Sequence, residues 1–67
     1  MNWAQEQRLN WIKEVLEVFG SLNRIHIMKK FRVSEPQSAL DLKLFMKKNP
    51  GLMIYNAASK RYERKDD

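Results

Sequence analysis

The stretch RVSEPQ at residues 32–37 contains several start signals for a helix. Ser34 followed three residues later by Gln37 forms a capping box, in which two side chains satisfy free backbone N–H groups. Pro36 falls in the first turn, where its missing N–H breaks no helical hydrogen bond. The NPG run at 49–51 disfavours a helical conformation before the proline and supplies turn residues. We therefore predict a helix over about residues 35–48.

The faces of this helix follow from its periodicity, because residues three and four apart share a face. We expect one face to pack inward; it consists of Ser38, Leu42, Phe45 and Met46. We expect the opposite face to point outward; it consists of Pro36, Lys43 and Lys47, with Leu40 and Leu44 beside them.

Two more helices are predicted upstream. Apolar residues recur at helical spacing before Gly20, which gives a helix over about residues 3–19 with Leu9, Ile12, Leu16 and Phe19 facing the core. Asn23 is an N-cap residue, and Leu22 and Ile27 are spaced as a hydrophobic staple around it. A second helix is therefore expected over about residues 24–31, with an apolar side of Ile25, Ile27, Met28 and Phe31.

Residues 52–64 are expected to form a β-hairpin, with strands at 52–55 and 60–64 and a loop at 56–59. The loop lacks glycine and leaves the turn type open, although Asn56 can take a positive φ. Residues 65–67 are expected to be a frayed end. The predicted fold is mostly α with a small β-hairpin, and we treat residues 1–67 as one domain. Three helices followed by a hairpin are the order of a winged helix-turn-helix.

Composition narrows the class of protein. The chain has 67 residues, no cysteine and 43% hydrophobic residues, so a single small core without disulfides is expected. It has neither an apolar run long enough to cross a membrane nor the pattern of a signal peptide, and we expect a cytoplasmic protein. Residues 21–67 contain eleven basic and five acidic side chains, a net charge of +6. A surface built from these residues would carry positive charge and would fit a polyanionic partner.

In a helix-turn-helix the second helix enters the major groove and residues of its first turns reach base edges. The base-reading candidates are Glu35, Pro36, Gln37, Ser38, Leu40 and Lys43. Gln37 could pair with adenine through its amide, or turn that amide back to cap the helix. The phosphate-contact candidates are Arg24, Lys29, Lys30, Arg32, Lys47, Lys60, Arg61 and Arg64.

From Gly20 to Arg64 the chain resembles the N-terminal winged helix-turn-helix domain of bacterial WYL-domain transcriptional regulators. The resemblance rests on Gly20, Asn23-Arg24, Phe31, Val33-Ser34, Pro36-Gln37, Asp41, Phe45, Pro50, Tyr55, Lys60 and Tyr62. It implies a repressor that binds operator DNA as a dimer, with Gln37 in the groove and Lys60 and Arg61 on the wing. The family often has glycine where Arg32 stands, and a polar residue where Leu40 stands. The larger sensing domain of that family is absent, so we expect either an excised domain or a small protein of a phage or mobile element.

Helix 3–19 has more apolar surface than one small core needs. The excess is expected either to form a homodimer interface or to cap the domain's own core, and the interface candidates are Trp3, Trp11, Val15 and Val18. The alternative function is a protein-interaction module that uses Leu40 and Leu44. We expect no enzyme activity, no metal and no cofactor, because His26 is the only histidine and no glycine-rich phosphate loop is present. Asp41 is expected to brace the motif through a salt bridge or a hydrogen bond.

Overall fold

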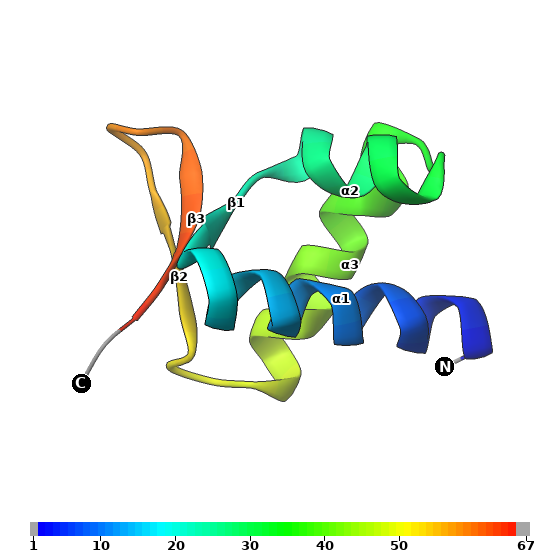
Figure 1. Ribbon diagram of the computed structural model, residues 1–67, viewed down its shortest axis with the longest axis horizontal. Coiled ribbons are helices and arrows are strands. Elements are labelled where there is room, and N and C mark those ends of the chain that lie inside the picture. Colours follow the sequence, from blue (N-terminus) through cyan, green and yellow to red (C-terminus); the bar gives the residue numbers. More distant parts are fainter. Residues whose placement is uncertain (1, 66–67) are drawn as a thin grey trace.

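Three helices form most of the computed structural model, which describes residues 2–65 (Figure 1). Each helix begins after a residue whose side-chain oxygen accepts a backbone N–H of the first turn, and these N-caps are Asn2, Asn23 and Ser34. Asp66 and Asp67, in the expected frayed end, lie outside the described residues. The helices are α1 (Trp3–Phe19), α2 (Arg24–Phe31) and α3 (Glu35–Lys48).

Left-handed residues end the first two helices. Gly20 has φ 80° and donates its N–H to Leu16 O, a conformation that glycine adopts without steric cost. Arg32 ends α2 at φ 55°. This is the position at which the resembling family often has glycine, and a side chain there costs roughly 1–2 kcal/mol.

A small antiparallel sheet lies at one end of the helices (Figure 1). The predicted hairpin is confirmed, with β2 at Met53–Asn56 and β3 at Arg61–Arg64. A third strand, β1 at Ser21–Leu22, pairs with β3 and was missed, so the sheet order is β1-β3-β2. The pairing of Ser21 with Glu63 and of Leu22 with Tyr62 ties the connection between α1 and α2 to the wing.

The turn at the tip of the wing, whose type the sequence left open, is set by the side chain of Asn56. Asn56 ends β2, and its Oδ1 accepts the N–H groups of Ala58 and Ser59 at 2.9 and 3.2 Å. The positive φ, 58°, occurs at Lys60 instead. Asn56 therefore shapes the loop through its side chain, as in an Asx turn, and not through its own backbone.

The core lies between α1, α3 and the sheet. Its buried members are Leu9, Ile12, Leu16, Leu22, Ile27, Leu42, Phe45 and Met53. Three residues expected inside are exposed, namely Phe19 (76%), Ile25 (48%) and Met46 (37%). Phe19 belongs to the last turn of α1, directly before the chain reverses at Gly20, and Met46 follows Phe45 by 100° around α3. No helix among residues 2–65 is long and apolar enough to cross a membrane.

Candidate nucleic-acid interface

The outward face of α3 is a stripe of exposed side chains. Pro36, Leu40, Lys43 and Lys47 are all exposed and recur at intervals of four, three and four residues, which keeps them on one side of the helix. On the opposite side Leu42 and Phe45 are buried in the core. The core therefore fixes which face of α3 is presented to solvent.

Ser38 does not belong to that exposed face, and its assignment as a base reader was wrong. Its side chain is fully buried, and its hydroxyl donates to Glu35 O at 2.7 Å. Ser38 precedes Leu42 by one turn and Phe45 by two, so it points into the core. The periodicity of the helix also predicts Ser38 on the inward face, and that prediction is confirmed.

Gln37 lies at the edge of the exposed face, and its side chain does not close a capping box. Ser34 Oγ accepts the Gln37 N–H at 3.2 Å, but the Gln37 amide Nε2 donates to Asp41 Oδ1 at 3.0 Å. Gln37 is partly exposed. Its amide is therefore held by the next turn of α3 and not by the backbone at the helix start.

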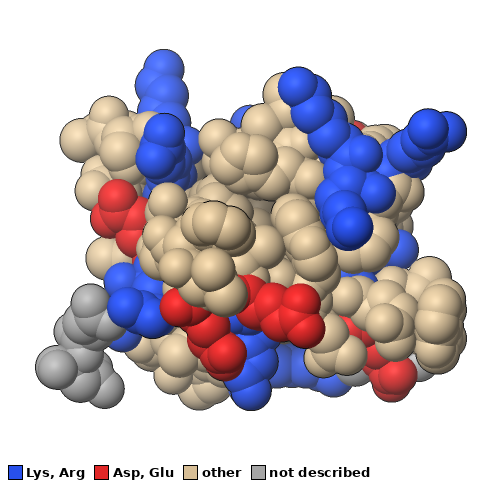
Figure 2. All heavy atoms as spheres, viewed as in Figure 1, with Lys and Arg blue, Asp and Glu red and all other residues tan. Residues whose placement is uncertain are grey.

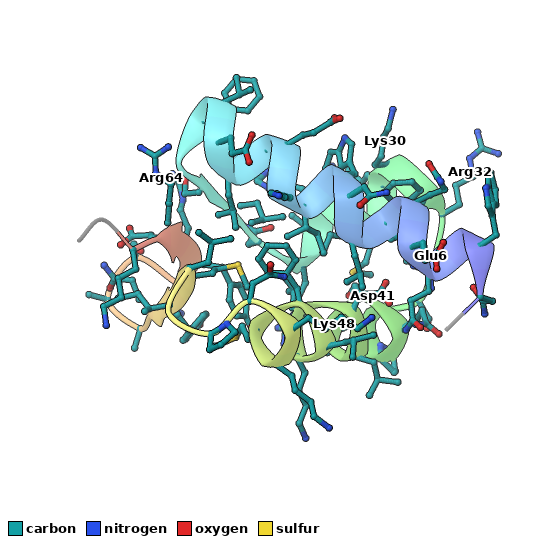
Figure 3. The ribbon with its side chains drawn as sticks, turned by 90° about the horizontal axis from the view of Figure 1, so that it is seen from below. Glu6, Lys30, Arg32, Asp41, Lys48 and Arg64 are labelled. Atoms are coloured by element: carbon teal, nitrogen blue, oxygen red, sulfur yellow. The ribbon has the colours of Figure 1, made fainter. Side chains whose placement is uncertain are left out.

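Asp41 is fully buried and forms an ion pair with Arg8 of α1, which confirms that it braces the motif. Arg8 Nε donates to Asp41 Oδ2 at 2.6 Å and Arg8 Nη2 donates to Oδ1 at 3.4 Å. The Gln5 amide also donates to Oδ1, at 3.4 Å. Figure 3 shows Asp41 between α1 and α3. Arg8 and Gln5 carry no local signal for this contact in the sequence, because 33 and 36 residues separate them from Asp41.

The first turn of α3 also meets α2. Glu35 and Arg24 are both exposed and form an ion pair at 3.9 Å. A pair at this distance in water contributes little to stability. It does place a cationic side chain of α2 at the N-terminus of α3.

The tip of the wing carries two exposed cations, Lys60 and Arg61. Below them Tyr55 and Tyr62 pair across the strands, with ring centroids 4.9 Å apart. Tyr62 packs against the core, so this aromatic pair anchors the wing to the helices.

An open groove separates the wing from the two helices of the helix-turn-helix. Asn23, Arg24, Ile25, Met28, Glu35, Tyr55, Lys60 and Tyr62 line it. The wing therefore stands beside the N-terminal ends of α2 and α3. We call the exposed face of α3, the wing tip and Arg24 the α3–wing surface; it consists of Arg24, Pro36, Leu40, Lys43, Lys47, Lys60 and Arg61. The surface contains five basic side chains, and one acidic side chain, that of Glu35, lies next to it beside Arg24.

The other phosphate-contact candidates do not join this surface. Lys29 lines a hollow with α1 residues, and Arg64 Nη1 donates to Glu17 O at the end of α1, at 3.3 Å. Lys30 and Arg32 project on the α1 side of the molecule, away from α3 (Figure 3). Figure 2 shows Lys and Arg side chains above the wing and above α2, with acidic side chains along α1. The phosphate-contact candidates are thus divided between the α3–wing surface and the side of the molecule that carries α1, and they do not converge on a single face.

Apolar residues of α1 are exposed at both of its ends. Trp3 is 73% and Val18 72% exposed, but 15 residues of helix, roughly 22 Å, separate them. Trp11 and Val15 are partly buried against the chain's own core, and Trp11 meets the Phe31 ring edge-on at 5.5 Å. The four dimer-interface candidates therefore do not form one patch. Trp11, Val15 and the exposed Phe19 do line one apolar hollow.

The side chain of His26 caps the start of α2. Its Nδ1 accepts the Asn23 N–H at 3.1 Å and completes a capping box at the start of α2. Among residues 2–65 no three His, Asp or Glu side chains lie close enough together to hold a metal ion.

Comparison with known proteins identifies this arrangement. Residues 4–67 match the family model described as the BrxR transcriptional regulator winged helix-turn-helix domain. The chain belongs to this family. The predicted likeness to the winged helix-turn-helix domain of WYL-domain regulators is thereby confirmed, as is the fold of three helices and a wing.

Relatives of this BrxR-type domain include proteins named DNA-binding transcriptional repressor CapW. One from Stenotrophomonas maltophilia is 32% identical over 62 residues, covering 92% of this chain and 21% of the relative. One from Escherichia coli (strain KTE188) is 37% identical over 60 residues, covering 90% of this chain and 20% of the relative. The chain therefore spans about a fifth of the length of these relatives.

Proposed function

We propose that this BrxR-type domain binds double-stranded DNA with sequence specificity and represses transcription from the bound site. The observation that carries the proposal is the α3–wing surface, on which an exposed helix face is flanked by cations on the wing and on α2. In this arrangement α3 enters the major groove and Lys60 and Arg61 contact the phosphate backbone. The names of the CapW relatives support repression, and such a regulator acts in the bacterial cytoplasm.

The base readers in this proposal are fewer than the sequence predicted. Leu40 packs against a thymine methyl group, Lys43 and Gln37 reach base edges, and Pro36 shapes the first turn at the groove. Glu35 pairs with Arg24 and keeps that guanidinium near the backbone. Ser38 is excluded because it is buried.

A salt titration tests DNA binding directly. Four of the cationic side chains on the α3–wing surface are phosphate-contact candidates, namely Arg24, Lys47, Lys60 and Arg61, and each phosphate contact contributes a slope of about −0.9 to log K against log salt. We expect a slope of about −3.6, which corresponds to a roughly 150-fold loss of affinity between 50 and 200 mM salt. Lys13→Gln, on the exposed side of α1, is the control and should leave the slope unchanged. Absence of duplex binding at low salt would refute the proposal.

A homodimer is a separate part of the proposal. The apolar hollow of Trp11, Val15 and Phe19, together with the exposed Val18, fits a second copy of the chain better than the distant Trp3 does. A two-fold dimer would read a pseudo-palindromic site.

A protein partner is the second candidate function, and one observation favours it. Leu40 is 58% exposed at the centre of the α3–wing surface. Leu44, the other residue expected to take part, is partly buried and packs against the core. Loss of duplex binding in Leu40→Asp is expected from DNA recognition, whereas unchanged duplex binding would favour a protein partner for this face.

A further inference from the structure

The amide of Gln37 can face Asp41 in only one orientation. An ionised carboxylate only accepts hydrogen bonds, so Gln37 must present its Nε2–H to Asp41 Oδ1, at 3.0 Å. Its Oε1 then has no hydrogen-bond partner among residues 2–65. No buried side-chain oxygen or nitrogen in that part of the chain lacks a partner, so Oε1 is open to solvent. The Nε2 end of the amide is therefore fixed by Asp41, whereas the Oε1 end is free.

Arg8 holds the carboxylate that fixes this amide. Its Nε and Nη2 donate to the two oxygens of Asp41, a fork geometry that sets the plane of the carboxylate. The Asp41 side chain is 0% and the Arg8 side chain 11% exposed, so neither can turn away into water. The orientation of a partly exposed amide on α3 thus depends on a residue of α1.

We propose that Arg8 and Asp41 are positioning residues that lock the Gln37 amide for adenine and against guanine, an inference that rests on the proposed DNA binding. With one N–H on Asp41, Gln37 keeps Oε1 and its second N–H for a base. That acceptor and donor match the N6 amino group and N7 of adenine. Guanine presents two acceptors, O6 and N7, and O6 would face Oε1. Because Asp41 already holds one N–H, the Gln37 amide has a single N–H left and cannot offer guanine two donors.

The double variant Arg8→Met/Asp41→Leu tests this lock, because apolar side chains of similar size replace a buried ion pair without leaving a charge unpaired. Duplexes bound from a random pool are sequenced for the parent and the variant. We expect the parent to prefer adenine over guanine at one position by at least about fivefold. We expect the variant to retain its affinity for unselected duplexes and to lose most of that preference. Lys13→Met/Glu14→Leu, a matched exchange on the exposed side of α1, should keep it.

An undiminished adenine preference in the folded double variant would overturn the inference. A second measurement on the parent covers the case in which the variant does not fold. The heteronuclear NOE of the Gln37 side-chain amide should equal that of the backbone, whereas the exposed Gln7 amide on α1 should give a low value. Equal mobility of the two amides would also refute the lock. Failure of the parent to bind any duplex would instead refute the proposed function, and the NOE would still report on the lock.

Discussion

Removal of the buried carboxylate, Asp41→Leu, is expected to cost a large part of the stability of this chain. The substitution leaves the Arg8 guanidinium, whose side chain is 11% exposed, without its counter-charge. Breaking a buried ion pair in this way costs about 3–5 kcal/mol. The free energy of unfolding of a domain of this size is roughly 3–10 kcal/mol. Gln5 and Gln37 are partly exposed and can turn to water, so the loss of stability arises mainly from the unpaired charge of Arg8.

Urea unfolding followed by circular dichroism measures this loss. Arg8→Met/Asp41→Leu should recover to within about 1–2 kcal/mol of the parent, because no charge is left buried. Glu14→Leu removes an exposed carboxylate from α1 and should change stability by less than about 0.5 kcal/mol. The reasoning fails if Asp41→Leu unfolds within 1 kcal/mol of the parent, on the order of the effect of an ordinary surface pair.

Three further outcomes are expected. Lys60→Gln/Arg61→Gln should lower the magnitude of the salt slope by about 1.8 and weaken all duplexes about equally; a change confined to one sequence would contradict phosphate contacts by the wing. Gly20→Ala should destabilise the chain by about 1 kcal/mol, and Arg32→Gly should stabilise it by about 0.5–1 kcal/mol, both measured by thermal unfolding, because both positions are left-handed. Val18→Glu should shift sedimentation from dimer to monomer, and identical sedimentation would exclude this end of α1 as the interface.

Local chemistry made the helices predictable from the sequence. Asn23 and Ser34 mark helix starts, and Gly20 marks an end, through bonds to residues at most four positions away. Such signals need no knowledge of the rest of the fold. The same is true of the hairpin, whose strands are separated by only four residues.

Contacts between distant residues account for what the sequence did not reveal. Strand β1 has two residues, too few for any periodicity, and exists only because β3 lies beside it. The Arg8–Asp41 pair joins residues 33 positions apart, although Asp41 alone was expected to brace the motif. Helical spacing placed Phe19 on the core face but could not show that its side chain is exposed, whereas Leu16 in the same turn is buried.

The candidate interface was predicted in its elements and only partly in its residues. The exposed stripe of α3 follows from periodicity, and the same periodicity would have excluded Ser38. The basic residues were taken as phosphate contacts because the positive charge lies in residues 21–67. Lys29 and Arg64 show why this was insufficient, since α2 and β3 each present side chains to α1 as well as to the groove.

Backbone amide shifts recorded during titration with a duplex taken from the random-pool selection test the central claim most directly. If the α3–wing surface binds DNA, the largest changes should fall on residues 35–47 of α3 and on Lys60 and Arg61. Amides of α1 between Trp11 and Val18 should change little. Large changes on α1 with none on α3 would contradict the account, because DNA would then bind the opposite side of the molecule.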